Sequence, residues 1–212
     1  MSRLATFLCL IAPLIGISQN AELLSNEGWK FEKSKYDVTV FGKNITGYEV
    51  KAFKVSGLID ASLDAVYRVV MDIEGYDEWY PNCKAGEVLD QPADSVQYRR
   101  IEFGLPWPFD NRESVNKLVA TKSTDSIWID VIDAYDYTEK SRNIYRVGKT
   151  EGFWIIEKEN ESQTRLTYSV IGEPGGIPKW IINIFLFDSP LEAVNNIREV
   201  VKRAEYAADP EP

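Results

Sequence analysis

One stretch of the sequence, GLPWPFDNRES at residues 104–114, brings charged groups to a place where they could do chemistry. Trp107 stands between two prolines, whose fixed backbone angles make the bend stiff. If the stretch joins two antiparallel strands symmetrically about Trp107, Glu102 faces Arg112 across the pair. The sequence therefore predicts a cross-strand ion pair, which either anchors a ligand or is an ordinary surface pair.

Residue types that catalysis commonly uses are scarce in this chain. It has no histidine, which removes the commonest general base and metal ligand together with Ser–His and Cys–His nucleophile arrangements. It also has no CxxC, Walker, GxGxxG or GxSxG motif. Carboxylates are numerous, but pairs such as Asp72 and Glu74 fall in polar sequence typical of a solvated surface. We therefore predict no metal site, no cofactor and no enzymatic activity.

Charge and cysteine content indicate which partners and which compartment suit the chain. A formal net charge of −9 repels nucleic acid phosphates, so we expect no nucleic acid partner. Residues 1–18, MSRLATFLCLIAPLIGIS, combine one charge, a short apolar run and small residues, which is typical of a signal peptide. An uncleaved anchor is the alternative. We expect export to a bacterial periplasm or outside a cell, and a monomer. Once Cys9 has been removed with the signal peptide, Cys83 is alone and cannot form an intramolecular disulfide.

The remaining sequence is predicted to form a single domain over residues 19–208, with a disordered tail at 209–212. The chain has 212 residues, of which 44% are hydrophobic, and this is enough for one well-buried core.

Hydrophobic periodicity places strands on both sides of one helix. Alternation over residues 29–59 predicts two or three strands, with turns at 42–44 and 46–47. The period then becomes helical, with Ser62 as the N-cap and Gly75 as the terminator. Further strands are predicted at residues 85–89, 96–103, 112–120, 126–133, 145–157 and 164–171. Their short connections are typical of an antiparallel sheet.

The end of the chain predicts a long helical region over residues 178–207. Ser189 begins an S-x-x-E pattern with proline next to it, which is typical of a capping box, so a second helix start or a kink is expected there. Upstream, the segment WIINIFLF is apolar almost all round. Such a segment must be covered on several sides or face something apolar that is not always present.

Four stretches in this order resemble START domains, the StAR-related lipid-transfer family. Trp79 with Pro81 and Asn82 resembles the family's W-x-P-N, and residues 108–113 resemble its segment of proline, arginine and acid. Residues 152–154 resemble its G-x-W strand, and residues 178–183 resemble the start of its C-terminal helix. The resemblance covers about residues 25–205. Glu113 departs from the aspartate of the family pattern.

This resemblance implies an α+β helix-grip fold, in which a curved antiparallel sheet wraps around a long C-terminal helix and encloses an apolar cavity. It also implies that Arg112, paired with Glu102, receives the polar head of a ligand there. The loop around Trp107 and the glycine-rich segment before the last helix are expected to open for exchange. The residues predicted to contact the ligand are Arg112, Glu102, Trp107, Trp79, Tyr98, Trp128, Trp154, Trp180, Ile184 and Phe185.

We therefore expect a non-enzymatic protein that binds a lipid or other hydrophobic small molecule, could transfer it, and makes transient contact with a membrane. Two alternatives stay open. The first is an enzyme of the cyclase or aromatase type, with Glu102, Tyr98 or Asp130 as the acid or base. The second is a closed protein-interaction module without a cavity.

Overall fold

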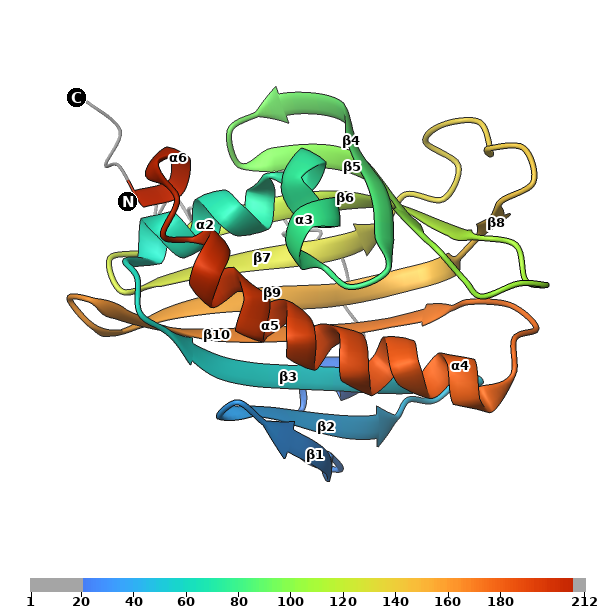
Figure 1. The fold of residues 1–212 in the computed structure, drawn as a ribbon, viewed down its shortest axis with the longest axis horizontal. Helices are drawn as coiled ribbons and strands as arrows, with labels where there is room; N and C mark the ends of the chain where they lie inside the picture. The colour runs from blue at the N-terminus through green and yellow to red at the C-terminus, as the bar shows by residue number, and fades with distance from the viewer. Residues whose placement is uncertain (1–20, 208–212) are drawn as a thin grey trace, which may run out of the picture.

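A computed structural model describes residues 21–207, and within them the chain forms one large curved sheet (Figure 1). The predicted signal peptide and the predicted tail from 209 lie outside these residues. The strands are β1 (Lys30–Lys35), β2 (Val38–Asn44), β3 (Lys51–Ile59), β4 (Cys83–Ala93), β5 (Val96–Phe103), β6 (Arg112–Lys122), β7 (Ser126–Asp133), β8 (Tyr145–Arg146), β9 (Gly148–Asn160) and β10 (Gln163–Glu173). The sheet does not close into a barrel.

The strand order is β1-β2-β3-β10-β9-β7-β6-β5-β4, and neighbours in this order are antiparallel. The short β8 pairs with β6 and runs parallel to it. Because β3 pairs with β10, the three N-terminal strands join the sheet beside its last strand, although β3 and β10 are far apart in the sequence. The resulting curved sheet has one face toward the helices and one outer face (Figure 1).

The helices cover the inner face of the sheet (Figure 1). They are α1 (Ala21–Leu24), α2 (Leu63–Met71), a 3₁₀ turn η1 (Ile73–Gly75), α3 (Tyr76–Trp79), α4 (Lys179–Asn183), a π turn η2 (Ile184–Asp188), α5 (Ser189–Val200) and α6 (Ala204–Ala207), with α1 placed apart on the outer face. The predicted α+β helix-grip architecture is confirmed. Among the described residues, no helix is both long enough and apolar enough to cross a bilayer.

The predicted start of α2 is confirmed. Ser62 is the N-cap, and its side chain accepts a hydrogen bond from the backbone N–H of Ala65 at 3.3 Å. The side chains of Val66, Val69 and Val70 are fully buried beneath this helix. The predicted helix is too long at its C-terminal end, because α2 stops at Met71 and a separate 3₁₀ turn ends at Gly75.

The predicted turn at residues 42–44 is wrong. These residues lie inside β2, where Gly42 pairs with Lys30 on one side and with Phe53 on the other. Pairing of all three residues with β3, and of Gly42 with β1 as well, holds the segment extended and overrides its local turn tendency. The chain reverses first at Tyr36 and Asp37, which both have positive φ, and again between β2 and β3, where the predicted turn at residues 46–47 is confirmed.

The capping box predicted at Ser189 is also wrong. The helix runs from α4 through the π turn into α5 without a fresh start, and Asp188, at the N-cap position, makes no side-chain cap. The Ser189 hydroxyl instead accepts a hydrogen bond from Asn82 Nδ2 at 3.1 Å. This bond ties the end of the W-x-P-N stretch to the C-terminal helix.

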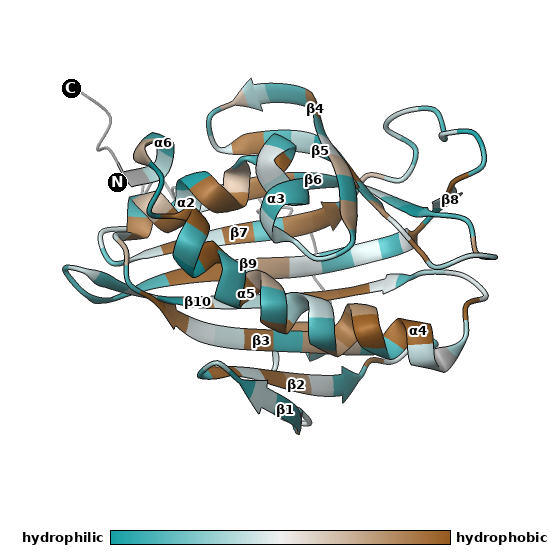
Figure 2. Cartoon of the chain, in the orientation of Figure 1, coloured by the Kyte–Doolittle hydropathy of each residue, from teal (hydrophilic) through white to brown (hydrophobic). Residues whose placement is uncertain are grey.

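Buried hydrophobic residues form one main core and a smaller cluster. The main core joins the inner face of the sheet to α2, α3 and α5. The smaller cluster includes Leu23, Ile45 and Phe153 and lies on the outer face, where the N-terminal segment packs. Hydrophobic residues also dominate the α4 end of the C-terminal helix, which leads to the cavity described below (Figure 2).

Candidate functional site

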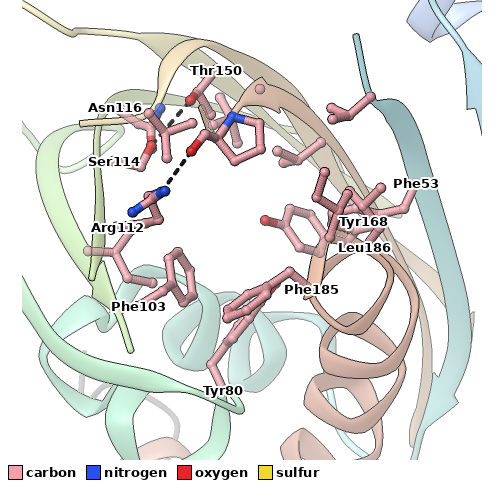
Figure 3. A pocket seen from close by; sticks show the side chains of 18 of the residues that line it. Phe53, Tyr80, Phe103, Arg112, Ser114, Asn116, Thr150, Tyr168, Phe185 and Leu186 are labelled. Atoms are coloured by element: carbon pink, nitrogen blue, oxygen red, sulfur yellow. Dashed lines mark hydrogen bonds between the residues drawn. The ribbon is translucent and has the colours of Figure 1, made fainter. Parts of the chain in front are cut away.

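A cavity of about 160 Å³ lies between the inner face of the sheet and the C-terminal helix. Most of its wall is apolar or aromatic. The side chains of Phe53, Tyr80, Phe103, Tyr168, Phe185 and Leu186 surround one part of it (Figure 3). Another part is lined by the polar wall, defined as Arg99, Arg112, Ser114, Asn116 and Thr150, of which Figure 3 labels the last four. The interior is therefore not filled by side chains, as a closed interaction module would require.

Arg112, the first residue of β6, is the charged group of the polar wall nearest the loops. Its side chain is buried, with Nε donating to the carbonyl of Pro174 at 2.7 Å and Nη1 donating to the carbonyl of Asp110 at 2.6 Å. Its guanidinium carbon lies 4.7 Å from the ring centroid of Tyr145. Burial lowers the pKa of Arg112 from its ordinary value, but an arginine remains charged at neutral pH.

The other members of the polar wall lie on the same face of the sheet as Arg112. Ser114 Oγ donates to Asn116 Oδ1 at 2.8 Å and lies 3.3 Å from Thr150 Oγ1. Asn116 Nδ2 is buried and has no hydrogen-bond partner within residues 21–207. Arg99 faces Asn116 across β5 and β6, and its Nη1 donates to the carbonyl of Val70 at 3.1 Å.

The aromatic wall is built by contacts between rings. Tyr168 stacks on Trp154 with ring centroids 3.6 Å apart, so Trp154 lies behind the cavity surface and supports it. Phe103 contacts Tyr80 at 5.5 Å and Phe185 at 6.2 Å between centroids. Burial raises the pKa of both Tyr80 and Tyr168, so each phenol is protonated at neutral pH.

The predicted pairing of Glu102 with Arg112 is wrong. Across β5 and β6, Arg112 pairs with Phe103 and Glu102 pairs with Glu113. The hairpin is therefore centred between Trp107 and the following proline, and not on Trp107 as the prediction required. This small shift changes every cross-strand partner by one residue. Asn111 closes the loop, because its Oδ1 accepts from the backbone N–H of residue 105 at 3.3 Å and its Nδ2 donates to Glu102 at 2.6 Å.

Glu113, rather than Glu102, is the acid that has an arginine partner, and the partner is Arg146. Both side chains are only 1% exposed, and Glu113 Oε1 lies 2.9 Å from Arg146 Nε and 2.8 Å from Nη2. Glu113 also accepts two hydrogen bonds from Ser141, and Arg146 donates to three carbonyls of residues 135–139. The pair faces away from the cavity and fixes the loop of residues 134–144 against β6.

Of the residues predicted to contact a ligand, Arg112 and Phe185 line the cavity. Three others, Glu102, Tyr98 and Trp128, alternate onto the outer face. There, Tyr98 stacks on Tyr137 at 4.0 Å, and Trp128 stacks on Phe153 at 5.0 Å. Successive side chains of a strand point to opposite faces, so the residues next to these three point toward the helices while these three point outward. They therefore do not line the cavity.

The remaining predicted residues are either inside the core or on the surface. Trp79 and Trp154 are fully packed in the main core, 2% and 1% exposed. Trp107 is 93% exposed at the tip of its loop, and Trp180 and Ile184 are exposed on the C-terminal helix. None of these five side chains lines the cavity. The aromatic character of a residue therefore did not predict whether it lines the cavity, packs in the core or lies at the tip of a loop.

Sequence reasoning did not select most of the polar wall. Ser114 and Asn116 could have been found from Arg112, because residues two and four positions along a strand point to the same face. Arg99 and Thr150 required knowledge of strand pairing. The predicted acids and bases of an enzyme, Glu102, Tyr98 and Asp130, do not line the cavity, and the described lining residues that carry a formal charge are both arginines.

Comparison with known families agrees with this architecture. A family model described as polyketide cyclase / dehydrase and lipid transport matches residues 59–197, which is more than half of the chain. The chain belongs to this family. The matched range begins at the end of β3 and ends within α5, so it includes most of the elements that enclose the cavity.

A curated relative and several solved structures are similar to most of the chain. The uncharacterized protein PA1579 of Pseudomonas aeruginosa is 29% identical over 197 residues, covering 92% of this chain and 95% of its own. The structure of a StAR-related lipid transfer protein fragment from Xanthomonas axonopodis is 26% identical, with a TM-score of 0.75, covering 84% of this chain and all of that chain. Human StAR-related lipid transfer protein 5 is 16% identical, with a TM-score of 0.73, covering 84% and 88%. The predicted resemblance to START domains is therefore confirmed.

Proposed function

We propose that this protein binds one hydrophobic small molecule, a lipid or a compact apolar compound, in the cavity and transfers it without changing it. The observation that carries the proposal is the wall itself, where aromatic and aliphatic side chains surround an unfilled space beside one polar wall. Burial of apolar ligand surface would drive binding at about 25 cal/mol per Å². The polar wall would set the orientation of the ligand.

The size of the cavity bounds what fits without rearrangement. A dry apolar cavity of about 150 Å³ holds a molecule the size of benzene. At about 160 Å³, this cavity fits one ring or a short chain, and a larger lipid would require the C-terminal helix or the adjoining loops to move. We also propose that the ligand enters and leaves when the loop at residues 104–111 and the glycine-containing segment at residues 172–178 open.

The composition of the wall favours binding over acid–base catalysis. Within the part of the chain that the structure describes, no aspartate or glutamate lines the cavity, and the sequence has no histidine to serve instead. The buried tyrosines have raised pKa values, which makes them poor general bases near neutral pH. These features support the proposal that the protein is a non-enzymatic carrier.

Native mass spectrometry of the protein purified from its own host tests the proposal, followed by extraction and identification of anything bound. One apolar molecule per chain is expected. A protein that is empty, and that also fails to take up compounds from a broad mixture of fatty acids, alcohols and aromatic compounds, would refute the proposal.

A matched pair of variants connects any bound molecule to the cavity. Leu186→Trp places a large ring into the space from the C-terminal helix and should abolish retention. Leu24→Trp makes the same change at a residue that is 43% exposed and outside the cavity, so it should retain ligand as the wild type does. Equal retention by the two variants would place the ligand elsewhere.

We further propose that the protein is exported after cleavage before Gln19, acts as a monomer in a periplasm or outside the cell, and contacts membranes transiently during transfer. The signal-like sequence of residues 1–18 supports export. N-terminal sequencing of the protein from its host would test this, because retention of Met1 would contradict cleavage.

A further inference from the structure

The charge of the cavity wall is opposite to that of the protein. The chain has 33 acidic and 24 basic residues and a net charge of −9. Among the described side chains, the cavity is nevertheless lined by two arginines, Arg99 and Arg112, and by no carboxylate. A lining drawn at random from this sequence would contain more acids than bases, so the wall has an unusual chemical character that the proposed binding of an apolar molecule does not explain.

Neither arginine is neutralised by the protein. Arg99 is 6% exposed and Arg112 is 8% exposed, and within residues 21–207 neither has a carboxylate oxygen within 4.0 Å. Asp110 acts on Arg112 through its charge only at longer range. Buried charges are costly unless they are paired, so a protein retains an unpaired one where a partner arrives from outside.

Their hydrogen bonds go to neutral oxygens. Arg112 donates to backbone carbonyls of the two adjoining loops, and Arg99 donates to the carbonyl of Val70 and to the hydroxyl of Tyr76. These bonds hold the guanidinium groups in place but leave their positive charge uncancelled. Arg99 thus supplies a fixed positive field, while Arg112, at the level of Phe103, borders the apolar part of the cavity.

A third donor points to the same ligand chemistry. Asn116 is 5% exposed, its Oδ1 is used by Ser114, and its Nδ2 has no partner in the described part of the chain. A buried amide N–H without an acceptor costs free energy comparable to a lost hydrogen bond. Both Arg112 and Asn116 line the cavity, so an acceptor-rich group bound along the polar wall is the kind of ligand group that these donors lack.

We infer that the ligand carries one anionic head group, a carboxylate or a phosphate, on a compact apolar body, and that Arg112 receives this group. The inference rests on the proposed binding function and narrows its ligand class. A neutral alcohol or an uncharged hydrocarbon fits the apolar part of the cavity but gives the arginines of the polar wall no negative charge to pair with. The ligand class is therefore a single-headed anionic amphiphile.

Isothermal titration with octanoate, octyl phosphate and octanol at pH 8 tests this inference, because the three probes share one chain and differ in head group. The wild type should bind at least one of the two anions about tenfold or more tighter than octanol, as a charge-assisted hydrogen bond implies. The comparison between octanoate and octyl phosphate identifies which anion the site takes. Octanol binding as tightly as both anions would overturn the inference.

Two substitutions locate the preference. Arg112→Gln should remove the preference for anions while the affinity for octanol stays within about threefold, and Arg112→Lys, which keeps the charge, should retain part of it. Arg100→Gln is the matched control, because Arg100 lies one strand position from Arg99, faces away from the cavity and pairs with Glu87. A full preference for anions in folded Arg112→Gln would also overturn the inference.

The same titrations separate this inference from the proposed function. If octanol binds in the cavity and the anions bind no more tightly, the binding function stands and the anionic head group is wrong. If none of the probes binds, and extraction yields no apolar ligand, the binding function itself fails and the inference fails with it. The wild-type measurement decides the matter even if a variant does not fold.

Discussion

Phe103 and Arg112 face each other across β5 and β6, and this pairing decides which side chains reach the cavity. Because strand side chains alternate, Ile101 and Arg99 point to the same face as Arg112, while Glu102 and Glu113 point to the other. A shift of one residue would exchange the two sets. The register therefore places an arginine without an acid partner in the cavity and sends the two neighbouring acids to the outer face.

Glu113→Ala should destabilise the protein by about 3–5 kcal/mol, because it leaves the Arg146 charge buried without a partner. Urea denaturation at pH 7 measures the change. Glu159→Ala is the control, since Glu159 pairs with Arg165 on the surface and both are more than 40% exposed. Equal stability of the two variants would contradict the importance of the buried pair.

The contribution of Glu113 should also depend on pH. Burial by itself raises the pKa of Glu113, but the hydrogen bonds from Ser141 and Arg146 outweigh it, so the pKa lies below its ordinary value. A carboxyl group with a lowered pKa in the folded state stabilises the fold above its unfolded pKa of about 4.3, and this stabilisation is lost as pH falls through the folded pKa.

The difference in unfolding free energy between wild type and Glu113→Gln should therefore be largest at neutral pH. It should shrink as the pH falls below about 4. Urea titrations at a series of pH values measure this difference for as long as the wild type stays folded. A difference that does not change between neutral and acidic pH would show that Glu113 does not act through its charge.

Gly152→Ala should cost at least about 2 kcal/mol, because an added Cβ would lie 2.2 Å from the carbonyl oxygen of Ser169 and 2.9 Å from the Cα of Val170. Both obstacles are backbone atoms, so the two strands must separate to make room. Gly176→Ala is the control, since nothing lies within 4 Å of its added Cβ. Thermal unfolding of both variants tests this reason for the glycine of the G-x-W stretch.

Trp79→Ala and Trp107→Ala should differ sharply, although both residues were predicted to contact a ligand. The first empties a core position that is 2% exposed and should cost about 3–5 kcal/mol. The second removes a side chain that is 93% exposed and should change the unfolding free energy by less than about 0.5 kcal/mol. Comparable losses in chemical denaturation would mean that Trp107 packs in solution.

The candidate site was predicted from the sequence only in outline. Arg112 and Phe185 were selected and do line the cavity, and the apolar segment around Phe185 indicated where a helix would face an unfilled space. Trp79, Trp128 and Trp154 could not be separated from lining residues, because the same large apolar ring suits a core, an outer cluster and a cavity wall. Only contacts distant in the sequence distinguish these places.

The sequence by itself determined the order of strands and helices, the cap at Ser62 and the α+β class. These properties depend on the period of hydrophobic residues and on hydrogen bonds between residues a few positions apart. Tertiary structure decided that Phe103 pairs with Arg112, that Glu113 pairs with Arg146 and that a cavity remains inside. The physical reason is that a shift of one residue reverses the faces of a strand, and a buried charge takes whichever partner the completed fold brings within reach.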